Sequence, residues 1–264
     1  MEHRPRKRFS QNFLVDRHYI ARIVDAIAPR AGDRLVEIGP GRGALTRPLL
    51  ERIERMTLLE IDRDLAAALA QELGGRVDVV VGDALDFDLA TLGRDLRIVG
   101  NLPYHISSPL LFHCARYESA IRDLHFMLQA EVVDRMAAAP DTGDYGRLSV
   151  TLQSLFDVQK LFRVPAGAFN PAPAVESAVV RLVPLAERRL RIDDRSLFEE
   201  VVAAGFGQRR KTLRNALAKL VEPGVLLALG IDPGARAETL AVGQFAAIAN
   251  AITARRAADQ PAGG

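Results

Sequence analysis

Residues 34–43 read RLVEIGPGRG, a short apolar run that enters a glycine-rich turn. The run predicts a buried strand over 34–38, and glycines at alternate positions after it let the backbone approach a ligand closely. A helix is expected over 44–55, and its N-terminus would add free N–H groups and the positive end of a dipole. The stretch therefore predicts a ligand-binding turn at the carboxyl end of a strand.

Strands and helices alternate on both sides of this turn. Amphipathic helices are expected over 17–29 and 65–73, and further strands over 56–61, 77–81, 96–100 and 124–128. Two more strands, over 152–164 and 175–183, would close the sheet as an antiparallel pair. The sequence thus predicts an α/β fold, a Rossmann-like, mostly parallel sheet of seven strands with helices on both faces.

The pattern becomes helical after Pro184, with helices expected over 196–205, 209–220 and 244–255. We therefore expect an α/β domain over 1–187, whose residues 1–16 form a basic N-terminal cap, and a small all-helical domain over 188–264.

Composition narrows the class of protein. The 264 residues are 48% hydrophobic, enough for a core, and no apolar run approaches the roughly 18 residues of a membrane span. The single cysteine, Cys114, allows no intramolecular disulfide and no cysteine-rich zinc site. The basic N-terminus lacks the apolar stretch of a secretory signal, so a cytoplasmic location is expected.

Positive charge is concentrated near the two ends of the chain, although the net charge is only +2. Residues 1–10 hold four basic side chains against one acid, and residues 201–221 hold five against none. This distribution favours a polyanionic partner gripped by both ends, whereas a merely solvated basic face is the simpler alternative.

Acidic residues end the strands that follow the glycine-rich turn. Glu60 ends the second strand and can accept hydrogen bonds from two ribose hydroxyls; Asp83, after the third, can accept one from an adenine amine. The G-x-G-x-G spacing, with Glu37 two residues before the first glycine, resembles that of S-adenosylmethionine-dependent methyltransferases rather than the NAD fingerprint.

The fourth strand ends in Asn101-Leu102-Pro103-Tyr104, which resembles the [Asn/Asp]-Pro-Pro-[Tyr/Phe] motif of methyltransferases that modify amino groups. An adenine N6 amine is a poor nucleophile because its lone pair is delocalised into the ring. The side-chain carbonyl of Asn101 and the backbone carbonyl of Leu102 could hold its two hydrogens. Pro103 would stiffen the loop, and Tyr104 offers a face for stacking an extruded base.

The chain as a whole, from about residue 6 to about residue 250, resembles the small-subunit ribosomal RNA adenine dimethyltransferases of the KsgA type. The most specific segments are RFSQNFL at 8–14, YGRLSV at 145–150, FNPAPAVES at 169–177 and RRKTLRN at 209–215. The glycine-rich turn, Gly82-Asp83-Ala84 and Asn101–Tyr104 also match, but other methyltransferases share the glycine-rich and Asn-Leu-Pro-Tyr motifs.

The resemblance implies S-adenosylmethionine as cofactor and a set of site residues. The implied cofactor-binding residues are Gln11, Asn12, Leu14, Gly39, Gly41, Glu60, Ile61, Asp83, Ala84 and Asn101. The implied catalytic residues are Asn101, Leu102, Pro103, Tyr104 and Phe169, the last stacking on the target base opposite Tyr104. The implied RNA-contacting residues are Arg6, Lys7, Arg8, Arg147, Arg209, Arg210, Lys211 and Arg214.

Two residues depart from the family pattern. His105 stands where many relatives have Asn, and Ala130 stands where Lys is common. His105 is interpreted as a loop histidine that pairs locally with backbone. Ala130 can alter an RNA contact but is not expected to touch the chemistry.

The resemblance implies dimethylation at N6 of two adjacent adenosines near the 3′ end of small-subunit ribosomal RNA. A monomer acting on the small-subunit precursor, without a metal, is expected. Two alternatives stay open: a large-subunit RNA adenine methyltransferase of the macrolide-resistance type, and an assembly or transcription factor that keeps the fold without catalysis. The segments at 145–150 and 209–215 favour the small-subunit family.

Overall fold

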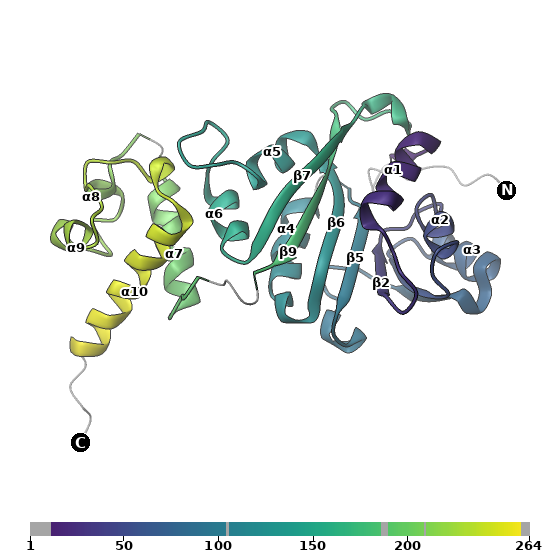
Figure 1. Cartoon of the computed structure of the whole chain (residues 1–264), viewed down its shortest axis with the longest axis horizontal. Helices are drawn as coiled ribbons and strands as arrows, with labels where there is room; N and C mark the ends of the chain where they lie inside the picture. Colours follow the sequence, from purple (N-terminus) through teal and green to yellow (C-terminus); the bar gives the residue numbers. More distant parts are fainter. Residues whose placement is uncertain (1–11, 104–105, 186–189, 209, 260–264) are drawn as a thin grey trace, which may run out of the picture. The chain divides into compact units, whose positions relative to one another are not determined.

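A computed structural model of the chain describes residues 12–103, 106–185, 190–208 and 210–259 (Figure 1). The chain divides into two compact units. The sheet unit comprises Met1–Val133 and Asp157–Pro184, and the helical unit comprises Asp134–Phe156 and Leu185–Gly264. The expected boundary after residue 187 lies close to Pro184, but segment 134–156, which the sequence placed in the first domain, belongs to the helical unit.

One seven-stranded sheet organises the sheet unit, in the order β4-β3-β2-β5-β6-β9-β7. Its strands are β2 (Arg34–Ile38), β3 (Met56–Glu60), β4 (Val77–Val81), β5 (Leu96–Asn101), β6 (Ile121–Gln129), β7 (Phe156–Val164) and β9 (Ser177–Pro184). The pairs β3–β4, β2–β3, β2–β5 and β5–β6 are parallel, and β6–β9 is antiparallel. The predicted α/β class and the mostly parallel sheet are confirmed.

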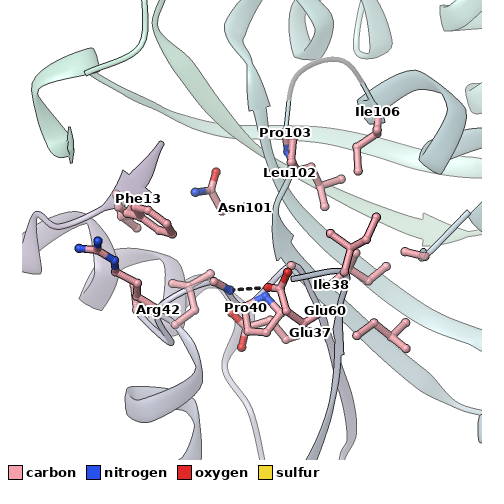
Figure 2. A pocket seen from close by; sticks show the side chains of 18 of the residues that line it. Phe13, Glu37, Ile38, Pro40, Arg42, Glu60, Asn101, Leu102, Pro103 and Ile106 are labelled. Atoms are coloured by element: carbon pink, nitrogen blue, oxygen red, sulfur yellow. Dashed lines mark hydrogen bonds between the residues drawn. The ribbon is translucent and has the colours of Figure 1, made fainter. Parts of the chain in front are cut away.

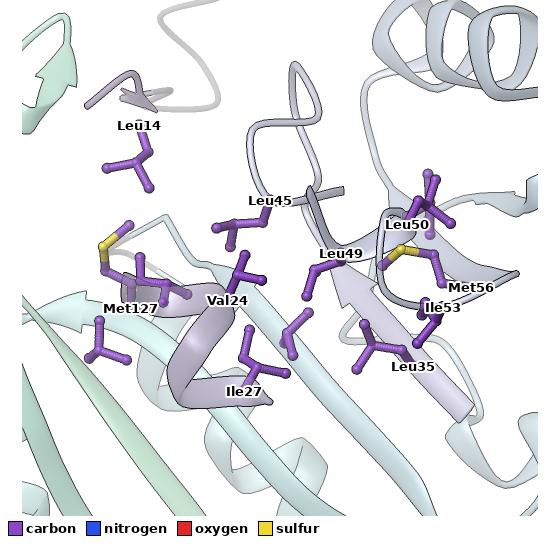
Figure 3. Packing of buried hydrophobic residues seen from close by; sticks show 14 of the residues in the cluster. Leu14, Val24, Ile27, Leu35, Leu45, Leu49, Leu50, Ile53, Met56 and Met127 are labelled. Carbon is purple, nitrogen blue, oxygen red and sulfur yellow. The ribbon is translucent and has the colours of Figure 1, made fainter. Parts of the chain in front are cut away.

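Helix α1 (Arg17–Ile27) covers part of the sheet because its apolar residues recur on one face. Asp16 caps it by accepting hydrogen bonds from the backbone N–H groups of His18 (2.8 Å) and Tyr19 (3.4 Å). Figure 3 shows Val24 and Ile27 of this helix in the same buried cluster as the strand residue Leu35.

The other helices of the sheet unit are α2 (Thr46–Leu50), α3 (Arg63–Leu73) and α4 (Ser107–Ala115), and α5 (Ala130–Met136) leads into the helical unit. Short 3₁₀ turns are η2 (Gly74–Arg76), η3 (Leu89–Leu92), η5 (Glu118–Ala120) and η6 (Ala166–Ala168). The helix expected over 44–55 is wrong in length. The guanidinium of Arg76 donates to the carbonyl oxygens of Leu50 and Ile53 and so supplies a donor to the Leu50 carbonyl, which a helix reaching residue 55 would bond to the N–H of Glu54.

A buried ion cluster lies where α1 ends against β5 and β6. The Arg97 side chain is only 8% exposed and lies 2.7 Å from Asp33 and 2.9 Å from Asp123. Its guanidinium also donates to the carbonyl oxygens of Ile27 (2.6 Å) and Ala28 (3.3 Å), at the C-terminus of α1. One arginine therefore satisfies two carboxylates and the end of a helix at the same time.

The helical unit contains α6 (Arg147–Gln153), α7 (Arg195–Phe206), α8 (Leu213–Ala216), α9 (Pro223–Ala228), η7 (Ala237–Thr239) and α10 (Val242–Asp259). Its core joins Tyr145 and Val150 of the early segment to Phe198 and Phe245 of the C-terminal helices. The Tyr145 hydroxyl donates to the Leu240 carbonyl over 2.8 Å. No helix of the described residues is long and apolar enough to span a bilayer.

Two predicted elements of this region are wrong. Leu152 and Gln153 end helix α6 instead of opening a strand, and β7 begins only at Phe156. The helix expected over 209–220 shrinks to Leu213–Ala216. There the backbone N–H groups of Leu213 and Arg214 donate to Ala235 and Pro233, over 2.8 and 2.9 Å, so this segment is bound to a neighbouring loop rather than to its own preceding turn.

Candidate functional site

A cavity of about 330 Å³ opens at the carboxyl ends of β2, β3, β4 and β5. This is where open α/β sheets bind their ligands, and the volume falls within the usual range for a small-molecule site. Its walls combine backbone of the glycine-rich turn with apolar side chains and two buried carboxylates. Figure 2 shows the labelled side chains around it, with Asn101 facing the glutamates across the space.

The glycine-rich turn forms one wall, and a side chain at Gly41 would crowd Phe13. The φ of Gly41 is +56°, in the left-handed region, and a Cβ there would lie 3.1 Å from Cε1 of Phe13. Phe13 in turn carries the guanidinium of Arg42 over its ring, 4.5 Å from the centroid. The turn is thus a cradle that only glycine backbone can form at this point.

Two glutamates lie at the floor of the cavity. Glu60 is 4% exposed, and its carboxylate accepts hydrogen bonds from the N–H groups of Gly41 and Asp62, each 2.9 Å long. Burial raises the pKa of Glu60 above its ordinary value, although these two hydrogen bonds act the other way. Glu37 is 2% exposed and accepts a 2.6 Å hydrogen bond from the Thr46 hydroxyl. Burial raises the pKa of Glu37 to about 7.

The turn after β4 contributes Asp83, Ala84 and Gly82 to the lining. The Asp83 side chain is exposed, and its Oδ1 accepts a 2.9 Å hydrogen bond from the backbone N–H of Leu85. This bond fixes the turn and leaves the carboxylate at the cavity wall.

Asn101 ends β5 at the mouth of the cavity. Its side-chain Nδ2 donates to the backbone carbonyl of Asn12 over 3.2 Å. The next residue, Leu102, is anchored by a 3.1 Å hydrogen bond from its N–H to the Met127 carbonyl. The Ser107 hydroxyl donates to the Pro103 carbonyl over 3.2 Å, which ties the loop to the start of α4.

A two-stranded sheet covers the cavity. Strands β1 (Phe13–Leu14) and β8 (Phe169–Asn170) pair in antiparallel fashion, with Leu14 opposite Phe169. Phe169 is 5% exposed and belongs to the hydrophobic core while also lining the cavity. This small sheet could not be predicted from the sequence, because two-residue strands carry no periodicity.

The cavity brings together every described residue that the sequence analysis assigned to the cofactor and the catalytic loop. These are Asn12, Leu14, Gly39, Gly41, Glu60, Ile61, Asp83, Ala84, Asn101, Leu102, Pro103 and Phe169. Gln11, Tyr104 and His105 lie outside the described residues. Phe13, Arg42 and Ile106 also line the cavity without having been predicted. Phe13 lies in the motif at 8–14 and Arg42 in the glycine-rich turn. Both motifs were recognised, but the binding roles were assigned to neighbouring residues of the same motifs.

The structure describes some of the predicted RNA-contacting residues. Arg147, Arg210, Lys211 and Arg214 are exposed on the helical unit, whereas Arg6, Lys7, Arg8 and Arg209 lie outside the described residues. Ala130 is buried at the start of α5, and its N–H donates to the Glu176 carbonyl over 2.9 Å. Within the described residues, no group of three or more His, Cys, Asp or Glu side chains is placed to hold a metal.

The donor set fits S-adenosylmethionine. Gly41 leaves backbone space that a Cβ would fill, two buried carboxylates suit hydroxyl groups and positive charge, and apolar walls suit an adenine ring. A parallel sheet with this cavity at its carboxyl edge, acidic residues after successive strands and Asn-Leu-Pro at the fourth defines an S-adenosylmethionine-dependent methyltransferase.

Comparison with known proteins specifies the family. Residues 2–254 match the ribosomal RNA adenine dimethylase family, and the chain belongs to it. Proteins of Aromatoleum aromaticum and Thiobacillus denitrificans, both named ribosomal RNA small subunit methyltransferase A, are 56% identical to it. The matches cover 96% of this chain in both cases, and 96% and 100% of the relatives.

Two solved structures share the fold over 92% of this chain. A dimethyladenosine transferase from Plasmodium falciparum superposes with a TM-score of 0.81 at 23% identity, over 98% of its length. The 23S rRNA methyltransferase ErmE superposes with a TM-score of 0.72 at 30% identity, over its whole length. The chain is therefore an S-adenosylmethionine-dependent enzyme of the ribosomal RNA adenine dimethylase family.

Replacing Gly41 with alanine should weaken binding of S-adenosylmethionine about tenfold or more. A left-handed φ costs a non-glycine residue about 1–2 kcal/mol of stability. The new Cβ, 3.1 Å from Cε1 of Phe13, would also crowd the cavity wall, and this crowding is what lowers the affinity, a tenfold loss corresponding to about 1.4 kcal/mol. Isothermal titration calorimetry measures the affinity. Gly74→Ala is the matched control, since Gly74 has a φ of +55° with no atom within 4 Å of a built Cβ. It should lower thermal stability similarly and leave cofactor affinity unchanged; equal affinity losses in both variants would contradict the role of the cradle.

Proposed function

We propose that this enzyme transfers two methyl groups from S-adenosylmethionine to N6 of each of two adjacent adenosines near the 3′ end of small-subunit ribosomal RNA. The observation that carries the proposal is Asn101, held at the cavity mouth by its Nδ2 contact with Asn12. With the amide in that orientation, the carbonyl oxygen remains to accept from an amine. The names of the 56% identical relatives support the small subunit as substrate.

The large-subunit alternative has weaker support. ErmE, named a 23S rRNA methyltransferase, is 30% identical, whereas the two small-subunit relatives are 56% identical over nearly the same length. An assembly factor without catalysis is disfavoured by the intact cavity, in which Gly39, Gly41 and Asn101 are all present.

The chain's own residues orient the acceptor. Bound S-adenosylmethionine supplies a methyl group on a sulfonium centre. The Asn101 side-chain oxygen and the Leu102 carbonyl accept the two hydrogens of the adenine amine, which directs the nitrogen lone pair into the cavity. Phe169, packed between core and cavity, stacks on the extruded base together with Tyr104. Methylation makes the nitrogen acidic, so its proton leaves to water without a dedicated base. Catalysis then rests on orientation and on hydrogen bonds strengthened in the transition state.

Acidic residues and the glycine-rich turn hold the cofactor in the same proposal. Glu60 takes the ribose hydroxyls, beside Ile61. Asp83 takes the adenine amine, beside Ala84. Gly39 and Gly41 approach the methionine portion, and Asn12 and Leu14, with Gln11, cover it. All of these except Gln11 line one cavity, which is why a single ligand can reach them.

Methyl transfer from labelled S-adenosylmethionine tests which ribosomal RNA is the substrate. Small subunits that lack the modification should accept label, up to four methyl groups each, and nuclease digestion should yield N6,N6-dimethyladenosine. Large-subunit RNA serves as the matched acceptor. Label on the large-subunit RNA alone would favour the ErmE-like activity, and binding to small subunits without transfer would favour the assembly factor.

The same proposal includes the oligomeric state, the partner and the cellular location of the enzyme. The enzyme acts as a monomer on precursor small subunits during ribosome biogenesis, in the cytoplasm, without a metal. Exposed arginines and lysine of the helical unit, Arg147, Arg210, Lys211 and Arg214, contact the phosphate backbone, and Arg6, Lys7, Arg8 and Arg209 extend this set.

Reversing Arg210 and Lys211 to glutamate should weaken binding to small-subunit RNA and flatten its salt dependence. Each lost phosphate contact lowers the slope of log affinity against log salt by about 0.9. Filter binding at several salt concentrations measures both quantities. Arg256→Glu, an exposed reversal on α10 of the same unit, is the control. Cofactor affinity should be unchanged in all variants; a wild-type salt slope in the double variant would show that this pair makes no phosphate contact.

A further inference from the structure

Two carboxylates share the floor of the cofactor cavity, and they belong to neighbouring parallel strands. Glu37 of β2 is 2% exposed and Glu60 of β3 is 4% exposed, and both line the cavity. Figure 2 shows the two side chains close together below Asn101. A pair of buried like charges is unfavourable in a low-dielectric site unless donors or positive charges offset it.

The two glutamate carboxylates differ in the hydrogen bonds that they accept. Glu60 accepts two backbone N–H hydrogen bonds, one to each carboxylate oxygen, which favour its charged form. Glu37 accepts one from the Thr46 hydroxyl on α2. Of the charged groups that act on Glu37, Glu60 on β3 opposes its ionisation and Arg47 on α2 favours it, but Arg47 is engaged by Glu72 at 2.7 Å. Burial therefore dominates, and the pKa of Glu37, about 7, leaves this carboxyl partly protonated near neutral pH.

The ligands of this cavity differ in charge before and after methyl transfer. S-adenosylmethionine carries a sulfonium, an ammonium and a carboxylate, for a net charge of +1. S-adenosylhomocysteine has lost the sulfonium charge and is neutral overall. Both ligands bring the ammonium and the carboxylate, so only the sulfonium charge distinguishes their effects on Glu37. A cation near a buried carboxyl favours its ionised form, and a neutral thioether adds no such effect.

We propose that Glu37 responds to the sulfonium charge of the ligand: it releases a larger fraction of its proton to solvent when S-adenosylmethionine binds than when S-adenosylhomocysteine does. The inference rests on the cofactor use described above and deepens it. Glu37 is a specificity-determining residue that disfavours the spent cofactor, so each turnover ends with a ligand that the site holds less well.

The sign of the pH dependence follows from linkage. Binding of the cation lowers the pKa of Glu37, so binding releases protons and becomes tighter as pH rises toward 7. The gain is complete above the pKa of the free site and is lost as pH falls through it. The ratio of the two affinities should therefore rise about threefold to tenfold between pH 6 and 7.5, since one fully coupled proton contributes about tenfold per pH unit.

Calorimetry on the full-length protein tests the proton directly. Titrations with each ligand in phosphate and in Tris, whose ionisation enthalpies differ, give the number of protons released. Near pH 6.5–7, wild-type protein should release a substantial fraction of a proton with S-adenosylmethionine, and clearly less with S-adenosylhomocysteine. Glu37→Gln cannot ionise, so it measures the protons exchanged by the ligand's own amino group, and its affinity ratio should not depend on pH through Glu37. Glu51→Gln removes an exposed carboxyl and should behave as wild type.

Each result decides the matter. Equal proton release by wild type and Glu37→Gln, or a pH-independent affinity ratio in wild type, would overturn the inference while leaving the methyltransferase function intact. Failure of wild type to bind either ligand would overturn the proposed function as well. Thr46→Val keeps the test open should Glu37→Gln fold poorly: loss of the 2.6 Å hydrogen bond should move the midpoint of the affinity ratio to higher pH, and an unmoved midpoint would contradict the inference.

Discussion

Asn101→Ala is expected to lower the turnover of methyl transfer by about 10²–10³, the loss typical of one preorganised hydrogen-bonding group that acts in the transition state. The affected interaction forms between the side-chain oxygen and the target amine, so its loss should appear in the single-turnover rate. Affinity for small-subunit RNA should change little, because phosphate contacts dominate it. Rapid-quench measurements with saturating labelled cofactor give the rate.

A matched variant separates chemistry from folding. Gln71→Ala removes an exposed amide from α3 of the same unit, outside the cavity lining, and should retain the wild-type rate. Asn101→Ala also loses the 3.2 Å contact to the Asn12 carbonyl, so cofactor affinity is measured separately. A near-normal single-turnover rate in Asn101→Ala would reject the role assigned to this amide.

Arg97→Ala should lower the free energy of unfolding by about 3–5 kcal/mol, the cost of leaving a buried charge without its partner. Asp123, 2.9 Å from the guanidinium, would remain buried without its arginine, whereas Asp33, at 2.7 Å, would keep its ion pair with Arg122. The carbonyl groups of Ile27 and Ala28 would also lose their donor at the end of α1. Urea unfolding followed by circular dichroism measures the change.

Arg122 provides the control for this cluster. It pairs with the same Asp33 at 2.6 Å and with Asp95, but its side chain is 42% exposed. Solvent screens such pairs, so Arg122→Ala should cost about 1 kcal/mol or less. Equal losses in the two variants would show that burial does not set the strength of the Arg97 interactions.

The sheet and its ligand edge were predictable because their signals are local and repeated. Apolar runs of five or six residues recur between helices, and each run ends in a polar or glycine residue that lines the cavity, as Gly39, Glu60 and Asn101 do. The carboxyl ends of parallel strands must lie along one edge, so these residues can be grouped from the sequence alone.

The errors occurred where tertiary contacts replaced local ones. Leucines at 213, 217 and 220 indicate a long helix, but the N–H groups of Leu213 and Arg214 are bound by a segment some twenty residues later in the chain. Arg210 and Lys211 consequently precede α8 rather than lie along it. At the end of α2, the Leu50 carbonyl likewise accepts from a residue distant in the chain, Arg76. Such partners leave no periodic trace in the sequence.

Segment 134–156 can pack against its structural partners only near the end of synthesis, because those partners lie in the C-terminal part of the chain. During synthesis it leaves the ribosome well before α7 and α10, whose Phe198 and Phe245 complete the core around Tyr145 and Val150. The roughly one hundred residues from the end of this segment to the end of α10 take about 5–20 s to make at about 5–20 residues per second. Throughout that interval the nascent chain displays apolar side chains whose cover has not yet been translated. A stop codon just after the last strand would make this state permanent, so we expect such truncated chains to aggregate or to be captured by chaperones.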